Sequence, residues 1–146
     1  MKARCLLLLA VGLLLAAGDA KDEVKKELAR FEGTWKLVSL ETEQNKLTEE
    51  ALKHLQLKLE GDKFTTFDEG RESHGTFKID PTKKPKTIDI TLTDGPMKGK
   101  TMVGIYELEG DTYKLCADIL GKNRPTEFAI KPGSGHVLEV LKREKK

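Results

Sequence analysis

The sequence is poor in residues that form covalent or metal-based frameworks. It contains two cysteines and three histidines among 146 residues, and Cys5 begins an apolar N-terminal run. Cys116 is the only cysteine outside that run, so it has no partner for an internal disulfide. We interpret Cys116 as a small apolar packing residue, because free cysteine usually behaves in this way. The histidines form no close pair and have no acidic residue at a usual ligand spacing, so we predict no metal site.

The sequence also lacks an apolar run long enough to cross a membrane. Cys5 to Ala17 is an uncharged run of 13 residues, against the ~20 that a spanning helix needs. Lys2 and Arg4 precede this run and small residues follow it, which is the layout of a cleaved secretory signal. The spacing of the small residues predicts cleavage after Gly18 or Ala20. The alternative is an uncleaved membrane anchor, which the short run disfavours.

A strong net charge is absent as well. Residues 1–20 are assigned as a signal peptide, and their removal leaves residues 21–146, with 24 basic and 23 acidic side chains. This balance argues against a nucleic-acid-binding protein, which usually presents a strongly basic face. We expect residues 21–146 to form a single domain that is exported to the periplasm or the extracellular space. No stable membrane insertion is expected after signal cleavage.

Two hydrophobic periodicities organise this domain. Val24, Leu28 and Phe31 have helical spacing, which predicts a short N-terminal helix, and residues 47–55 predict a second helix of one or two turns. The rest alternates with a period of two, with turn signals every 8–12 residues or so, which predicts an all-β sandwich or barrel. Short sequential turns favour an up-and-down antiparallel barrel, whose closure removes exposed edges. About nine strands are predicted: TWKLVSLE, LQLKLE, KFTTF, HGTFKID, TIDITLT, TMVGIYEL, TYKLCA, TEFAIK and HVLEVLK.

The only tryptophan stands at the start of the first predicted strand. Gly33-Thr34-Trp35 resembles the G-x-W signature of lipocalins and related calycin barrels. The resemblance implies that Trp35 closes the narrow end of the barrel beneath a cation from the last strand. Arg143 is the candidate for that cation, and Lys142 is the second choice. Gly33 would allow a close approach of the chain, and a stack of tryptophan and guanidinium is a physically sensible structural plug.

The resemblance extends over nearly all of the domain, from Gly33 to Glu144. The chain resembles a lipocalin-like family of unknown function that is expanded in planctomycetes. This implies export and a lipocalin-like barrel of about eight to nine strands, but no activity, because the family has no established catalytic residues. The matching segments are GTWKLVS, LTEEAL, GDKFT, GTFKIDPTKKPKTIDI, GPMKGKTMVGIYELEGDTYKLC, RPTEF and PGSGHVLEVLKRE.

Motifs for catalysis are missing. The segment GPMKGKT has three residues between its first glycine and Gly-Lys-Thr, where a phosphate-binding loop has four, and it leads into a predicted strand. No serine stands in a nucleophile elbow, and paired carboxylates fall at a helix start and in a turn. We therefore predict no catalytic residues, no cofactor and no enzymatic activity.

The interior of the barrel is where we expect function. Because strand side chains alternate between the two faces, residues on the charged face of each strand should point outward. Cys116 should accordingly point outward or toward the helix, away from the cavity. The inward set is apolar with a tyrosine hydroxyl as a polar handle, which suits an uncharged or amphipathic small ligand. The alternative is a filled core that serves as an interaction or scaffold module of the cell envelope. No feature of the sequence identifies a protein partner. The predicted cavity lining consists of Leu57, Leu59, Phe64, Ile88, Ile90, Leu92, Tyr106, Tyr113 and Leu115.

Overall fold

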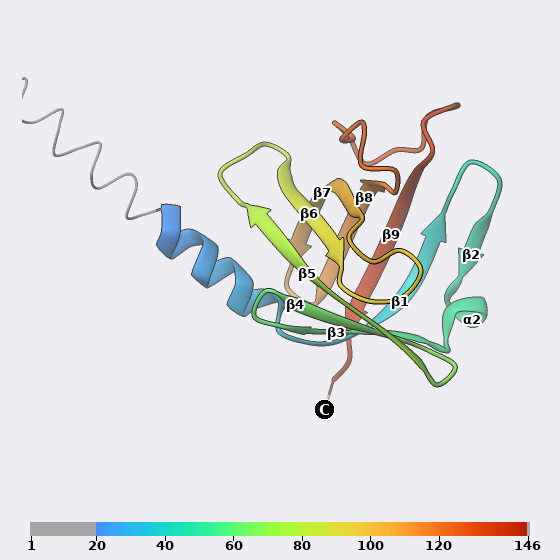
Figure 1. The fold of residues 1–146 in the computed structure, drawn as a ribbon, viewed down its shortest axis with the longest axis horizontal. Helices are drawn as coiled ribbons and strands as arrows, with labels where there is room; N and C mark the ends of the chain where they lie inside the picture. The colour runs from blue at the N-terminus through green and yellow to red at the C-terminus, as the bar shows by residue number, and fades with distance from the viewer. Residues whose placement is uncertain (1–19, 146) are drawn as a thin grey trace, which may run out of the picture.

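The computed structural model describes residues 20–145, which form an all-β barrel (Figure 1). The signal peptide predicted for residues 1–20 lies outside the described residues, except for its last residue. Within the described range one antiparallel sheet has nine strands. Its bounds are β1 (Gly33–Glu41), β2 (Lys46–Thr48), β3 (Leu55–Glu60), β4 (Lys63–Asp68), β5 (Arg71–Asp80), β6 (Lys86–Leu92), β7 (Thr101–Glu109), β8 (Thr112–Asp118) and β9 (His136–Arg143).

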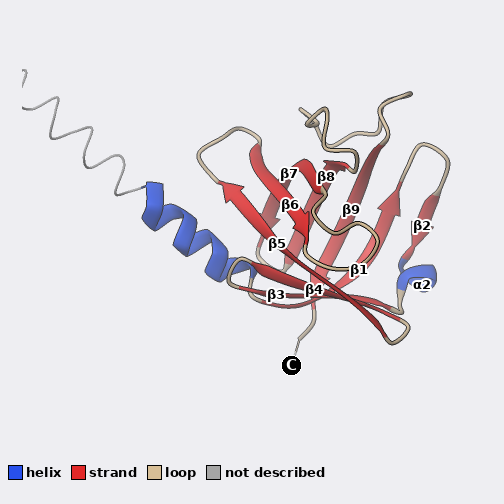
Figure 2. Cartoon of the chain, in the orientation of Figure 1, coloured by secondary structure: helices blue, strands red, loops and turns tan. Residues whose placement is uncertain are grey.

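Eight of these strands close into a barrel. From β3 to β9 each strand pairs with the next, and β1 completes the ring by pairing with both β3 and β9. The predicted fold class, an up-and-down lipocalin-like barrel, is confirmed. Among residues 20–145, helices are confined to residues 20–31 and to the single turn of α2 (Glu49–Leu52) between β2 and β3, and Figure 2 shows how little of the described chain they occupy.

One predicted strand is wrong. Residues 126–131 (TEFAIK) have irregular backbone within the long connection between β8 and β9. Because β8 pairs with β7 and β9, and β9 with β8 and β1, neither strand has a free edge for this segment. The ninth strand is instead the short β2, which extends the sheet beside the far end of β1.

The β8–β9 connection covers part of the outer face of the barrel. Arg124 attaches it to β6 and β7, donating to the carbonyl oxygens of Ile88 and Gly104 at 3.1 and 2.8 Å. Beneath it Cys116 is fully buried, with its Sγ 3.9 Å from the carbonyl oxygen of Ala129. Cys116 therefore lies on the outer face, under this connection, and burial raises the pKa of its thiol.

The N-terminal helix (residues 20–31) closes one end of the barrel. Its apolar face follows helical spacing, and Val24 and Leu28 pack against the core while Phe31 is fully buried within it. The ring of Phe31 lies at centroid distances of 5.7, 5.1 and 5.1 Å from those of Phe77, Tyr106 and Tyr113. This aromatic cluster fills the closed end. No helix among residues 20–145 is long and apolar enough to cross a membrane.

Candidate functional site: the barrel cavity

The closed end is built around Trp35, which is fully buried. Its Nε1 donates a hydrogen bond of 2.8 Å to the carbonyl oxygen of Phe31, which ties the start of β1 to the end of the N-terminal helix. The guanidinium of Arg143 lies 4.3 Å from the centroid of the indole ring, within the range of a cation–π contact. The indole is therefore enclosed by the helix, the aromatic cluster and an arginine of β9.

Arg143 also binds the backbone that leads into β1. Its guanidinium donates to the carbonyl oxygens of Arg30 and Glu32, and its Nε donates to Asp111 at 3.0 Å. Gly33 has a φ of 127°, and a Cβ at this position would lie 3.1 Å from the Arg143 guanidinium. Glycine is required here because other residues strain at this φ and would press on the arginine. Gly33, Trp35 and Arg143 thus form one structural plug, whereas Lys142 is exposed.

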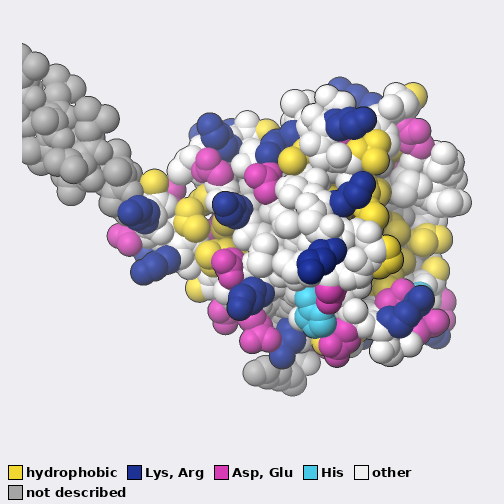
Figure 3. All heavy atoms as spheres, viewed as in Figure 1, with side chains coloured by type: hydrophobic (Ala, Val, Ile, Leu, Met, Phe, Trp, Pro, Cys, Tyr) yellow, Lys and Arg dark blue, Asp and Glu magenta, His cyan; other side chains and the backbone are white. Residues whose placement is uncertain are grey.

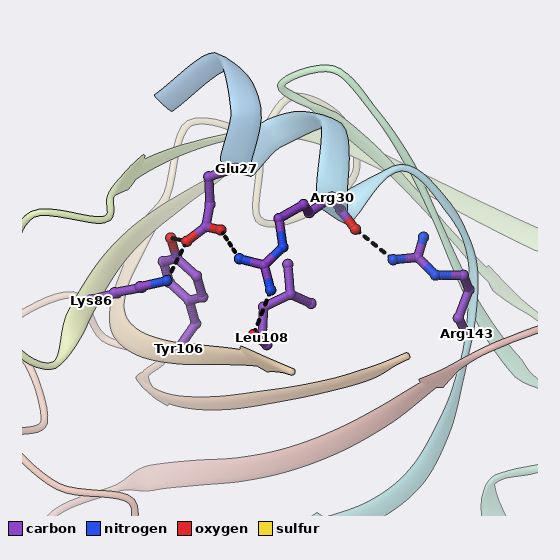
Figure 4. Close-up of polar contacts among 6 residues, drawn as sticks. All are labelled: Glu27, Arg30, Lys86, Tyr106, Leu108 and Arg143. Carbon is purple, nitrogen blue, oxygen red and sulfur yellow. Dashed lines mark hydrogen bonds and ion pairs between the residues drawn. The ribbon is translucent and has the colours of Figure 1, made fainter. Parts of the chain in front are cut away.

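A buried carboxylate fastens the N-terminal helix to the barrel (Figure 4). Glu27 is 4% exposed and accepts hydrogen bonds from Arg30 at 2.6 Å, from Lys86 at 2.7 Å and from the Tyr106 hydroxyl at 2.9 Å. Burial opposes the ionisation of Glu27, but the hydrogen bonds from Lys86 and Tyr106 and the charges of Lys86 and Arg30 outweigh it, so its pKa is lowered. The ionised carboxylate therefore joins the helix to β6 and β7.

We predict that Glu27→Gln destabilises the fold by about 2 kcal/mol at neutral pH. Removing one partner of a buried ion pair costs about 3–5 kcal/mol, and we discount this figure because Arg30 and Lys86 remain partly in water. The lowered pKa of Glu27 means that its contribution is present above the unfolded pKa and is lost as pH falls through the folded pKa. Urea unfolding measures both effects, and a loss that stays equal in strongly acidic buffer would contradict this role.

Tyr106 is a correction to the predicted lining. It points into the barrel as its strand parity requires, but it lies in the closed end and is 1% exposed. Its hydroxyl donates a hydrogen bond to Glu27, and burial together with that hydrogen bond raises the pKa of Tyr106. Alternation along a strand predicts the face of a residue, whereas its height along the barrel depends on the register of the sheet.

Beyond the aromatic cluster the barrel holds a cavity of about 370 Å³. Phe31 and Tyr113 form its floor, while Leu92 and Met102 line it near the other end of the barrel. Figure 3 shows a recess with hydrophobic side chains, in yellow, between the β6–β7 loop and the region of β1 and β2. The lining includes eight of the nine residues proposed from the sequence: Leu57, Leu59, Phe64, Ile88, Ile90, Leu92, Tyr113 and Leu115.

One lining residue that the sequence analysis missed is a carboxylate. Glu139 lies on β9 between Val137 and Leu141, and all three side chains line the cavity. Its register partners are Leu115 on β8 and Leu40 on β1. Glu139 has no ion pair or hydrogen bond to other described residues, and burial raises its pKa to about 7. An acid whose pKa is shifted by burial in a cleft is a typical mark of a functional site.

A second polar group stands beside this carboxylate. Tyr113 on β8 is one step along the barrel from Leu115 and also lines the cavity. Burial raises its pKa, as does the nearby charge of Glu139. Its hydroxyl has no hydrogen-bond partner among residues 20–145 and retains accessible surface. Glu139 and Tyr113 thus place two polar groups of neighbouring strands in a mostly apolar lining, whose other polar residues, Gln56, Thr66, Asp68 and Ser73, lie on β3 to β5.

The charged side chains of the lining are all acidic. Asp68 and Glu139 are among the lining residues, whereas lysine, arginine and histidine are absent from the described lining. Asp68 lies at the end of β4 and interacts with His54 at 3.4 Å and with Arg71 at 3.5 Å. Glu139 is thus the acidic group of the lining that has no cationic neighbour.

No group of three or more metal-ligating side chains occurs among the described residues. No known family model matches the chain, and no curated protein matches it.

Proposed function

We propose that this chain is an exported, non-enzymatic binding protein that holds one small apolar or amphipathic molecule in its barrel. The observation that carries the proposal is the cavity of about 370 Å³ above the aromatic cluster. Ligand pockets usually measure about 300–1,000 Å³, so this cavity matches a small ligand. We include membership of the lipocalin-like family in the proposal, and the barrel with its plug supports it.

The arrangement of the two ends supports binding over a filled scaffold. The Trp35 plug and the Phe31 cluster close one end without occupying the middle of the barrel. The apolar lining would favour uptake of an apolar molecule, because ligand transfer from water removes apolar surface on both partners. A scaffold module has no need of an unfilled interior, which costs packing energy. The signal-like N-terminus supports a setting outside the cytoplasm.

Binding of a neutral, environment-sensitive dye tests this function. N-phenyl-1-naphthylamine is titrated into the protein, and saturable one-to-one binding with enhanced fluorescence is expected. Leu57→Trp should abolish binding or weaken it by about tenfold or more, because the larger side chain fills the cavity. Lys58→Trp is the matched control, since residue 58 is exposed on the outer face and should bind as the wild type does.

Native mass spectrometry of protein purified from its host gives an independent readout. A co-purifying small molecule that competes with the dye would support the proposal. Absence of dye binding together with absence of any retained molecule would favour the scaffold alternative.

A further inference from the structure

We propose that the cavity selects an amphipathic amine, whose ammonium group pairs with Glu139 and the Tyr113 hydroxyl while its apolar body fills the barrel. This inference rests on the proposed binding function and names the class of its ligand. It is carried by three observations: an unpartnered carboxylate inside an apolar cavity, an unpartnered hydroxyl beside it, and a lining without cationic side chains.

Glu139 has no partner for its charge among the described residues. A charged group placed in apolar surroundings is unfavourable unless it is paired, and the buried Glu27 of the same chain is paired with Lys86 and Arg30. Glu139 lacks such a partner among the described residues, although it stands between apolar neighbours on both sides of its strand. A ligand that brings a positive charge would supply that partner.

The acidic lining favours a ligand with a positive charge over one with a negative charge. A fatty-acid anion would meet Glu139 and Asp68 in the cavity and would find no lysine, arginine or histidine in the lining. An ammonium group, in contrast, would find the Glu139 carboxylate as a charge-assisted acceptor. The Tyr113 hydroxyl offers a further acceptor, because a hydroxyl oxygen can accept while its proton donates elsewhere.

An amine and a neutral ligand would differ in how their affinity depends on pH. A neutral ligand with a carbonyl group would bind the protonated form of Glu139, so its affinity would fall as pH rises. An amine binds the ionised form, so its affinity rises over the same range as long as the amine itself stays protonated. The other titratable groups facing this region are Tyr113 from β8 and Asp68 from β4, with His54 and Arg71 beside Asp68 at the rim.

The test displaces the neutral dye with octylamine, 1-octanol and octanoate, which share one chain length and differ in the head group. We expect octylamine to bind about tenfold or more tightly than 1-octanol, as for a hydrogen bond to a charged group. Glu139→Gln should collapse the ratio of the two affinities to about one. Tyr113→Phe should reduce that ratio, and Glu107→Gln, a change on the outer face between inward residues of β7, should leave it unchanged.

A pH series on the wild type tests the same point without a variant. The affinity for octylamine should rise from about pH 5.5 to about pH 8.5 while that for 1-octanol stays flat. His54→Gln should retain the rise, which separates Glu139 from the imidazole at the rim.

Each result decides between the two proposals. Equal binding of octylamine and 1-octanol, or tighter binding of octanoate, would overturn the amine inference and leave the binding function standing. An octylamine preference that survives in Glu139→Gln would also overturn it. Failure of the dye and of all three octyl compounds to bind would overturn the binding function itself.

Discussion

Trp35→Ala should lower the free energy of unfolding by about 3–5 kcal/mol, as for other large-to-small changes at fully buried aromatic positions. The indole is fully buried, donates a hydrogen bond to the Phe31 carbonyl and lies beneath the Arg143 guanidinium. Its removal leaves a cavity at the closed end and also deprives Arg143 of the ring it covers. Urea unfolding followed by far-ultraviolet circular dichroism measures the loss without depending on tryptophan fluorescence.

Two further variants show whether the loss of stability comes from removal of the aromatic ring of Trp35. Trp35→Phe should lose less, because an aromatic ring remains under Arg143 although the hydrogen bond of the indole is gone. Lys36→Ala, the neighbouring outward residue with an exposed side chain, should change stability by about 0.5 kcal/mol or less. A solvent-like emission maximum of the folded wild type, or a cost for Trp35→Ala no larger than that for Lys36→Ala, would refute the structural plug.

Glu139→Leu should make the ligand-free protein more stable at alkaline pH by about 2–3 kcal/mol. Burial raises the pKa of Glu139 from 4.5 to about 7, and each pKa unit is worth about 1.4 kcal/mol. We take a value below the full difference because the cavity admits water, which lessens the cost of the charge. The expected gain corresponds to the destabilisation of the folded protein by an ionised carboxylate in an apolar cavity.

The sign of the effect follows from proton binding. Between about pH 4.5 and pH 7 the folded protein retains the Glu139 proton that the unfolded chain has lost, so raising the pH across this range favours the unfolded chain and lowers the stability of the fold. Glu139→Leu removes this pH-dependent loss of stability. The difference in unfolding free energy between variant and wild type should therefore increase from about pH 5 to about pH 8.

The pH dependence, and not the absolute gain, is the decisive observation, because leucine also adds apolar contacts. His74, whose pKa is raised chiefly by its hydrogen bond with Asp94, is common to both proteins and cancels in the difference. Glu107→Leu, on the outer face of β7, should show no comparable pH dependence. A stability difference between Glu139→Leu and wild type that is constant with pH would mean that Glu139 is not held in an apolar environment.

A gain in stability of Glu139→Leu would be consistent with a role of Glu139 in binding. Binding sites commonly retain groups that lower the stability of the free protein because those groups are satisfied by the ligand. Glu27 and Glu139 illustrate the contrast within one chain. Glu27 is surrounded by its own donors and holds the helix in place, whereas Glu139 is surrounded by leucines and faces the cavity.

The alternation of apolar residues predicts strands and most of the residues that face the interior, and the short sequential turns favour a barrel over a sandwich. Leu57 and Leu59, or Ile88 and Ile90, share a face because successive strand side chains point to opposite sides whatever the rest of the fold does. Gly33, two residues before Trp35, is singled out through the resemblance to the G-x-W signature. The structure supplies the reason for glycine, which is the positive φ together with the close approach of Arg143. The alternation is a local property of each strand, so it can be read from the sequence without knowledge of the pairing.

The tertiary structure alone decided the features that depend on pairing and register. In HVLEVLK one face carries Glu139 and the other Lys142, so the pattern does not tell which face is inside until β9 is paired with β8 and β1. Tyr106 has the predicted parity but lies in the closed end, because its height along the barrel is set by the register of β6 and β7. Residues 126–131 have strand-like composition yet form no strand, because β8 and β9 leave no free edge for them to join.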